Sequence, residues 1–190
     1  EEITTAYPFR KFKIRKEDTR NRSLTIEQLR QYLNLDDLSD TDREYRDMFL
    51  LTFYLIGINI VDLARLTSES IVGGRIEYRR AKTGKLYSIK IQPEAQEIID
   101  RYAGAKRLLS PFERYKSYRD YNHDLNDGLK RLGPANGKKA RNGVRKRTPI
   151  EKDCSTYWAR HTWATIAYGL DIPDGTIAAA LGHSHGNRNR

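Results

Sequence analysis

One arginine in this chain lies in a segment whose other residues are mostly apolar. Trp158, Ala159, Trp163 and Ile166 flank Arg160 at helical spacing. A guanidinium on such a helix needs an anion or several carbonyl oxygens, because leaving it unpaired inside a protein is energetically costly. The pattern therefore predicts either a structural carboxylate partner or a bound phosphate for Arg160.

One short segment could complete a phosphate site with Arg160. Leu181-Gly182-His183 ends a helical pattern at a glycine and presents a histidine directly after it. Arginine and histidine can both donate hydrogen bonds to phosphate oxygens. Together with this segment, the arginine favours a bound phosphate over the structural carboxylate.

The histidines do not predict a metal site. His161, His183 and His185 have no cysteine or carboxylate at ligand spacing, whereas a structural zinc site needs four ligands. We expect His161 to pack against the domain and His185 to be solvated, with no metal and no other cofactor. Cys154, the single cysteine, is expected to fill space beside a helix start.

The composition is that of a globular protein with a basic surface. The chain has 190 residues, enough for one domain, and is 38% hydrophobic and 32% charged. Its longest apolar stretch, residues 49–58, is too short to span a bilayer, and no apolar signal segment is visible. The lone cysteine favours a reducing cytoplasm. The net charge of +10 favours a polyanionic partner, and nucleic acid is the first candidate.

A strongly basic segment follows Gly133-Pro134. No acidic residue lies between Gly128 and Ile150, so the segment is either solvated or bound to a polyanion. We favour the second interpretation and expect contacts to DNA from Lys138, Lys139, Arg141 and Arg145.

Local patterns predict a mostly α-helical domain with a small antiparallel β-sheet, an α+β fold. Thr25–Gln28 and Thr41–Glu44 match capping boxes, and the helix after the second is apolar nearly all round, so we expect it to be buried and to end at Gly57. The remaining patterns predict a hairpin of strands 75–80 and 86–91, and helices near 60–66, 93–102, 115–132, 155–170 and 173–181. We expect residues 1–22 to form an arm, either as a short edge strand or as the end of a linker, with a solvated tail as the alternative. We expect residues 23–190 to form the domain.

Four short segments, in this order, resemble the catalytic domain of the tyrosine recombinase (phage integrase) family. They are Gly57-Ile58-Asn59-Ile60-Val61-Asp62-Leu63, Lys82-Thr83-Gly84, Ala159-Arg160-His161 and Leu181-Gly182-His183. Each segment alone is a weak signal, but their order and spacing together make a strong one. The resemblance covers nearly the whole chain.

The resemblance implies site-specific recombination or integration of double-stranded DNA, as carried out by mobile genetic elements. In this family a tyrosine attacks a backbone phosphate, giving a 3′-phosphotyrosine and a free 5′-hydroxyl without ATP or metal. Arg160 and His183 would contact the phosphate oxygens, and Lys82 would protonate the leaving 5′-oxygen. The family also implies a homo-tetramer assembled on paired DNA sites.

Two positions depart from the family pattern. Asn59 stands where the first arginine is expected, and Tyr157 stands where a histidine usually precedes the second arginine. Arg80, two residues before Lys82 and expected on the same strand face, is our candidate substitute for the missing arginine, although a surface strand arginine is the alternative. Tyr157 could still donate a hydrogen bond to phosphate.

The nucleophilic tyrosine of the family falls beyond Arg190 at this spacing, so we expect the catalytic domain to be incomplete and inactive by itself. Neither Tyr157 nor Tyr168 occupies the nucleophile position. The alternative function is a non-catalytic DNA-binding protein that retains the recombinase fold, which Asn59 and Tyr157 favour. An RNA-binding module is disfavoured because no known signature of that class is present.

Overall fold

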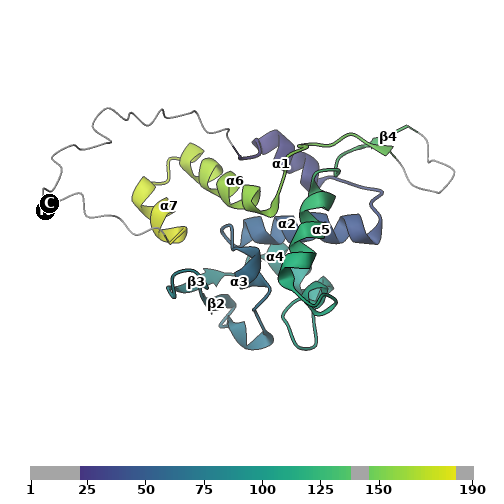
Figure 1. The fold of residues 1–190 in the computed structure, drawn as a ribbon. Helices are drawn as coiled ribbons and strands as arrows, with labels where there is room; N and C mark the ends of the chain where they lie inside the picture. Colours follow the sequence, from purple (N-terminus) through teal and green to yellow (C-terminus); the bar gives the residue numbers. More distant parts are fainter. Residues whose placement is uncertain (1–21, 138–145, 183–190) are drawn as a thin grey trace, which may run out of the picture.

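A computed structural model describes residues 22–137 and 146–182, and Figure 1 shows how the elements are arranged. The helices are α1 (Ile26–Leu33), α2 (Asp40–Tyr54), α3 (Ile60–Leu63), α4 (Pro93–Arg101), α5 (Tyr118–Leu129), α6 (Thr156–Gly169) and α7 (Asp174–Ala180). The strands are β1 (Ile71–Val72), β2 (Arg75–Arg79), β3 (Leu86–Lys90), β4 (Ala135–Asn136) and β5 (Lys146–Arg147). Single turns of 3₁₀-helix cover Ser68–Ser70 (η1) and Ser110–Glu113 (η2). The predicted α+β class is confirmed.

Helix α2 is the centre of the core. It packs against α4, α5 and α6, and Met48, Phe49 and Leu51 have no measurable exposure. The sequence predicted a buried helix here because its apolar residues point in nearly every direction. Two carboxylates are buried with it: Glu44 accepts hydrogen bonds from Arg114, and Asp47 accepts them from Arg46, Arg101 and Tyr102. These partners compensate the cost of burying charge on the central helix.

One of the two predicted capping boxes is present. Thr25 accepts a hydrogen bond from the backbone of Gln28, whose side chain accepts one from the backbone of Thr25. The prediction of the second box was wrong, because α2 begins at Asp40 and Ser39 is its N-cap, accepting from the Asp42 backbone. Serine is a somewhat better N-cap than threonine, and Ser39 stands two residues earlier, so Thr41 falls inside the first turn.

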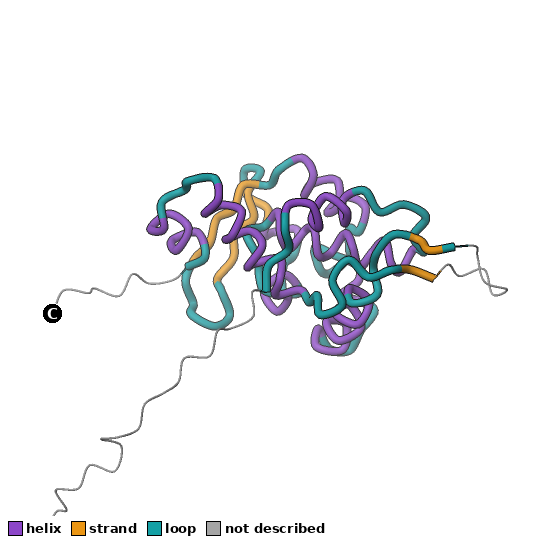
Figure 2. The backbone as a smooth tube through the Cα atoms, turned by 90° about the horizontal axis from the view of Figure 1, so that it is seen from above, coloured by secondary structure: helices purple, strands orange, loops and turns teal. Residues whose placement is uncertain are grey.

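The predicted hairpin is confirmed, with Tyr78 of β2 opposite Tyr87 of β3. β1 adds a third antiparallel strand, which the sequence did not predict because two residues are too few to show alternation. Helix α5 begins at Tyr118 rather than residue 115, because Ser117 caps it. The short β4–β5 pair was also missed, and it lies at the opposite end of the molecule from the three-stranded sheet (Figure 1 and Figure 2).

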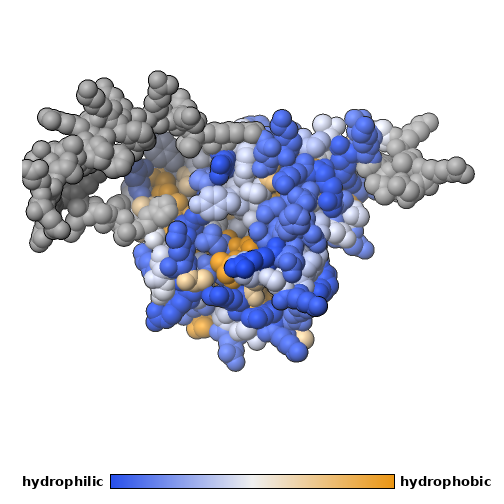
Figure 3. All heavy atoms as spheres, viewed as in Figure 1, coloured by the Kyte–Doolittle hydropathy of each residue, from blue (hydrophilic) through white to orange (hydrophobic). Residues whose placement is uncertain are grey.

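Cys154 is fully buried directly before α6, as predicted for a space-filling side chain. Burial raises the pKa of its thiol to about 12. Hydrophilic residues cover most of the face seen in Figure 3. Within the described part of the chain, no helix combines the length and apolar character that crossing a membrane requires.

The turn between α2 and α3 brings the chain against α6. Helix α2 ends at Tyr54, before the predicted Gly57, and both Ile56 and Gly57 then adopt left-handed backbone conformations, with φ of 58° and 67°. A Cβ atom on Gly57 would overlap the Cα of Arg160 and lie 2.7 Å from its Cγ. Glycine is therefore required here both by its φ angle and by the close approach of α6.

We expect Gly57→Ala to lower the free energy of unfolding by about 2–5 kcal/mol, from left-handed strain plus overpacking against α6. Gly73→Ala is the matched control, because Gly73 also has a positive φ (55°) but the space that a methyl group would occupy there is open, with no atom within 4 Å. That variant should lose only the strain component, about 1–2 kcal/mol. Urea unfolding measures both, and equal losses would contradict the close-packing argument.

Candidate functional site

Arg160 lies on α6 and is buried, with 7% of its surface exposed. Its Nη1 donates to the Gly57 carbonyl at 3.1 Å, and its Nη2 donates to the Leu181 carbonyl. The guanidinium therefore joins the turn after α2 to the end of α7. Both of its partners are neutral backbone groups.

Among the described residues, no acid neutralises the charge of Arg160. Across residues 22–137 and 146–182, no carboxylate lies within ion-pair distance of its guanidinium, so the structural partner considered from the sequence is not found there. Burial, and secondarily the positive charge of Arg80, lowers the pKa of Arg160. An arginine remains protonated even so. The described residues thus hold a buried cation that is bonded to two carbonyl oxygens and paired with no carboxylate among them.

Arg80, in the turn after β2, also contacts the Leu181 carbonyl. It is half-buried, and its Nη1 lies 3.4 Å from the Leu181 carbonyl oxygen that Arg160 also contacts. β2 ends at Arg79, so Arg80 and Lys82 lie in the connecting turn rather than on one strand face as predicted. The turn is nevertheless well defined, because Arg80 bonds through its backbone to Lys85 and Gly84.

Asp62 anchors this turn. It is buried, with 3% exposure, and its carboxylate accepts a hydrogen bond from the backbone of Ala81 at 2.7 Å. Ala81 stands between Arg80 and Lys82, so the acid fixes the segment that carries both cations. Lys82 itself is exposed in this turn.

The two departures from the family pattern share one small hollow. Asn59 and Tyr157 line a cavity of about 30 Å³ together with Arg160, Gly57 and Thr156. Its volume suits about one water molecule. Asn59 is the N-cap residue of α3 but makes no capping hydrogen bond with its side chain. Tyr157 is half exposed and packs edge-on against His161, with ring centroids 4.8 Å apart.

His161 packs beside the site, as the sequence predicted. Burial lowers the pKa of its imidazole, and the charges of Arg22 and Arg160 lower it further. His161 is therefore neutral at neutral pH and adds no positive charge to the cluster around Arg160.

Several predicted site residues lie outside the described residues. They are His183 and the four basic residues Lys138, Lys139, Arg141 and Arg145. The described chain ends at Gly182, directly before His183, where φ is 68°. The paired strands β4 and β5 stand before and after residues 138–145 in the sequence. The roles of these five residues stay predictions.

Tyr87 is a site residue that sequence reasoning missed. Its ring is buried and stacks on Tyr78, with ring centroids 5.2 Å apart, and its hydroxyl donates to the Leu181 carbonyl at 3.1 Å. The only signal in the sequence was its inward position in the alternating strand. That position indicates burial and does not indicate which polar atom the hydroxyl meets.

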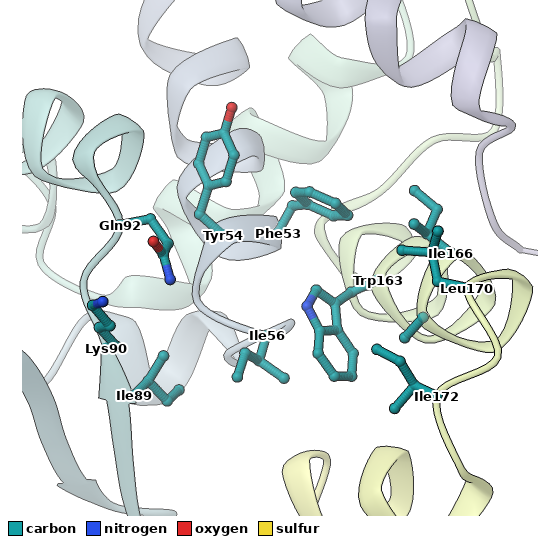
Figure 4. Close-up of a pocket in the computed structure, with 11 residues that line it drawn as sticks. Phe53, Tyr54, Ile56, Ile89, Lys90, Gln92, Trp163, Ile166, Leu170 and Ile172 are labelled. Carbon is teal, nitrogen blue, oxygen red and sulfur yellow. The ribbon is translucent and has the colours of Figure 1, made fainter.

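A larger hollow, lined partly by α6, is apolar. It has a volume of about 370 Å³, and Trp163 lies between Ile56 and Ile172 within it (Figure 4). Its polar side chains, Lys90 and Gln92, stand together at one edge. Without converging polar groups it does not resemble a site for chemistry. The charged cluster around the Leu181 carbonyl is the better candidate.

No family model matches the sequence, and no curated protein matches it either. Solved structures do match. The catalytic core of lambda integrase superposes with a TM-score of 0.57 at 18% identity, covering 88% of this chain and 95% of the core. A lambda integrase tetramer bound to a Holliday junction gives a TM-score of 0.60 at 17% identity, covering 91% of this chain. The Tn1549 transposon integrase in complex with circular intermediate DNA gives 0.58 at 16% identity, covering 89%.

The chain therefore has the catalytic-domain fold of the tyrosine recombinases, as the sequence resemblance implied. It spans nearly all of the isolated core but only 48% of the integrase chain in the Holliday-junction structure and 60% of the Tn1549 chain.

We expect the cluster to bind inorganic phosphate, because two arginines converge there and no carboxylate of the described residues pairs with Arg160. Arg80→Ala should weaken binding by at least about 10-fold, the value of one charge-assisted contact. Arg160→Lys, which keeps the charge but loses the planar fork, should weaken it similarly. The measurement is a phosphate titration followed by side-chain NMR of the arginines.

Arg65→Ala is the control for the removal of charge, because Arg65 is exposed and lies between α3 and η1. It should bind phosphate like the wild type. Equal weakening by Arg80→Ala and Arg65→Ala, with none by Arg160→Lys, would show that phosphate responds to overall charge and that the cluster is not a site.

Proposed function

We propose that this chain is the catalytic domain of a tyrosine recombinase that acts on double-stranded DNA in site-specific recombination or integration. The observation that carries the proposal is the pair Arg160 and Arg80, which meet at the Leu181 carbonyl in a fold shared with integrases. Solved integrases of this fold, including the lambda and Tn1549 proteins, are bound to DNA. The net charge of +10 supports the same polyanionic partner.

The residue types fit the reaction of the family. A tyrosine oxygen would bond to phosphorus as the bond to the 5′-oxygen breaks, and the phosphate ester would be retained as a 3′-phosphotyrosine. Arg160 and Arg80 would stabilise the negative oxygens of the transition state. Lys82, exposed on its turn, would protonate the departing 5′-oxygen, and His183 would donate a hydrogen bond to a non-bridging oxygen.

Arg80 would take the role of the first arginine in place of Asn59. An asparagine donates hydrogen bonds but carries no charge, and loss of one preorganised donor typically costs about 100- to 1000-fold in rate. Asn59 lines the small hollow beside Arg160, while Arg80 approaches from the sheet and contacts the carbonyl that Arg160 also contacts. Tyr157, at the same hollow, would supply its hydroxyl as a further donor.

The whole protein would assemble as a homo-tetramer on paired DNA sites in the cytoplasm. The lambda integrase tetramer on a Holliday junction supports this assembly for a protein of the same fold. No metal or cofactor enters the proposed reaction, because arginines supply the positive charge.

A non-catalytic DNA-binding protein is the second candidate. Asn59 and Tyr157 favour it, because the reaction loses a charged donor at one position and an imidazole at the other. Phosphate binding at Arg160 and Arg80 would be common to both functions, so a test of covalent chemistry is needed to separate them.

We expect the chain to bind duplex DNA mainly through phosphates. Neutralising Lys138, Lys139, Arg141 and Arg145 should reduce the slope of log affinity against log salt concentration by about 0.9 for each phosphate that is no longer bound. The measurement is fluorescence anisotropy of a labelled duplex over a range of salt concentrations. Four exposed basic residues on α1 and at α5 provide the charge-matched control, changed to Gln: Arg30, Arg119, Lys130 and Arg131. An unchanged slope in the first variant would place residues 138–145 away from the DNA.

Covalent chemistry can be tested with a nicked suicide duplex, which traps a 3′-phosphotyrosine on a denaturing gel. We expect no adduct from residues 1–190, because Tyr157 packs edge-on against His161 and Tyr168 is exposed on the last turns of α6. A tyrosine supplied in line with the leaving group is required for attack. An adduct at Tyr157 or Tyr168 would contradict this expectation. An adduct that appears when a C-terminal extension bearing a tyrosine is added, and vanishes in Arg160→Lys, would distinguish the enzyme from the binder.

A further inference from the structure

The Leu181 carbonyl is the meeting point of three side chains. As the cap of α7 it is one of the last carbonyls of a helix, which have no partner within the helix. It accepts hydrogen bonds from Arg160 Nη2, from Arg80 Nη1 at 3.4 Å and from Tyr87 Oη at 3.1 Å. A buried carbonyl must keep at least one such partner, because losing all of them is costly.

The three donors differ in what else they can do. Arg160 and Arg80 are the two cations that would hold a phosphate, and a phosphate oxygen is a stronger acceptor for a guanidinium than a neutral carbonyl. An anion bound at the cluster would therefore compete with the Leu181 carbonyl for both arginines. The Tyr87 hydroxyl carries no positive charge, so its attraction to the anion is weaker and it can remain bonded to the carbonyl.

Tyr87 is held firmly enough for this role. Its ring is buried in the sheet, opposite and stacked on Tyr78, at an interplanar angle of 19°. Its hydroxyl lies against Gly182, where a Cβ atom would overlap the hydroxyl and lie 2.5 Å from the ring carbon that bears it. Gly182 is thus the residue that allows the hydroxyl to reach the Leu181 carbonyl, and His183 follows one peptide bond later.

We infer that Tyr87 is a positioning residue that holds the Leu181–Gly182 turn while Arg160 and Arg80 bind a phosphate. This inference rests on the proposed function, because it assigns the two arginines to an anion. Tyr87 itself does not touch the substrate. Its hydroxyl satisfies the carbonyl that the arginines release, so the turn keeps its place during binding.

The test is amide hydrogen exchange at Gly182, whose N–H donates to the Ala179 carbonyl at 2.9 Å, with and without saturating inorganic phosphate. Tyr87→Phe removes the hydroxyl and keeps the stacked ring. Without phosphate the arginines still hold Leu181, so exchange should resemble that of the wild type. With phosphate, exchange at Gly182 in Tyr87→Phe should rise about 2- to 10-fold, the effect of one hydrogen bond.

Tyr168→Phe is the matched control, because Tyr168 is 67% exposed on α6, and it should behave as the wild type in both conditions. If Tyr87→Phe raises exchange equally with and without phosphate, the hydroxyl is merely structural and the inference is wrong. No rise in either condition also overturns it. If the Arg160 side-chain NMR signal of the wild type does not respond to phosphate, the anion site of the proposed function fails and this inference fails with it. A responding Arg160 with unchanged Gly182 exchange refutes the role of Tyr87 alone.

Discussion

The site depends on one buried guanidinium that, within the described residues, is held by backbone carbonyls and by no acid. Arg160 ties the turn after α2 to the end of α7 through Gly57 and Leu181. A carboxylate in either place would neutralise the charge and remove the reason to bind an anion. Carbonyl oxygens fix the side chain while leaving its full positive charge in place.

This arrangement constrains the segments around it. Gly57 must be glycine because α6 passes too closely for a Cβ atom, and Gly182 must be glycine because Tyr87 occupies that space. Asp62 is also buried, and its carboxylate accepts a hydrogen bond from the backbone of Ala81. It therefore orders the turn that carries Arg80 and Lys82 without pairing with Arg160. This buried acid therefore supports the positive cluster and does not cancel it.

On the central helix, by contrast, the buried charges are paired with charges of opposite sign. On α2, Glu44 and Asp47 are each bonded to arginines at the edge of the core, so their charges are compensated within the chain. Because each buried carboxylate already has a cationic partner, these pairs do not require a ligand to balance their charge. The acids on α2 have arginine partners, whereas Arg160 and Arg80 contact a backbone carbonyl. This difference is the physical reason for placing the functional site at Arg160 and Arg80.

Periodicity and residue type are local properties, and they were enough to predict the class of fold, the burial of α2, the hairpin, and the anomaly of an arginine within an apolar helix. The same local reasoning misplaced the start of α2, since Ser39 is a somewhat better cap than Thr41 and stands two residues earlier, and it missed β1 and β4–β5, which are too short to show alternation. The sharing of the Leu181 carbonyl by Arg80, Tyr87 and Arg160 became visible only in the folded chain. The contacts of Arg80 and Tyr87 join residues about 100 positions apart, and no local pattern specifies which polar atoms meet across that separation.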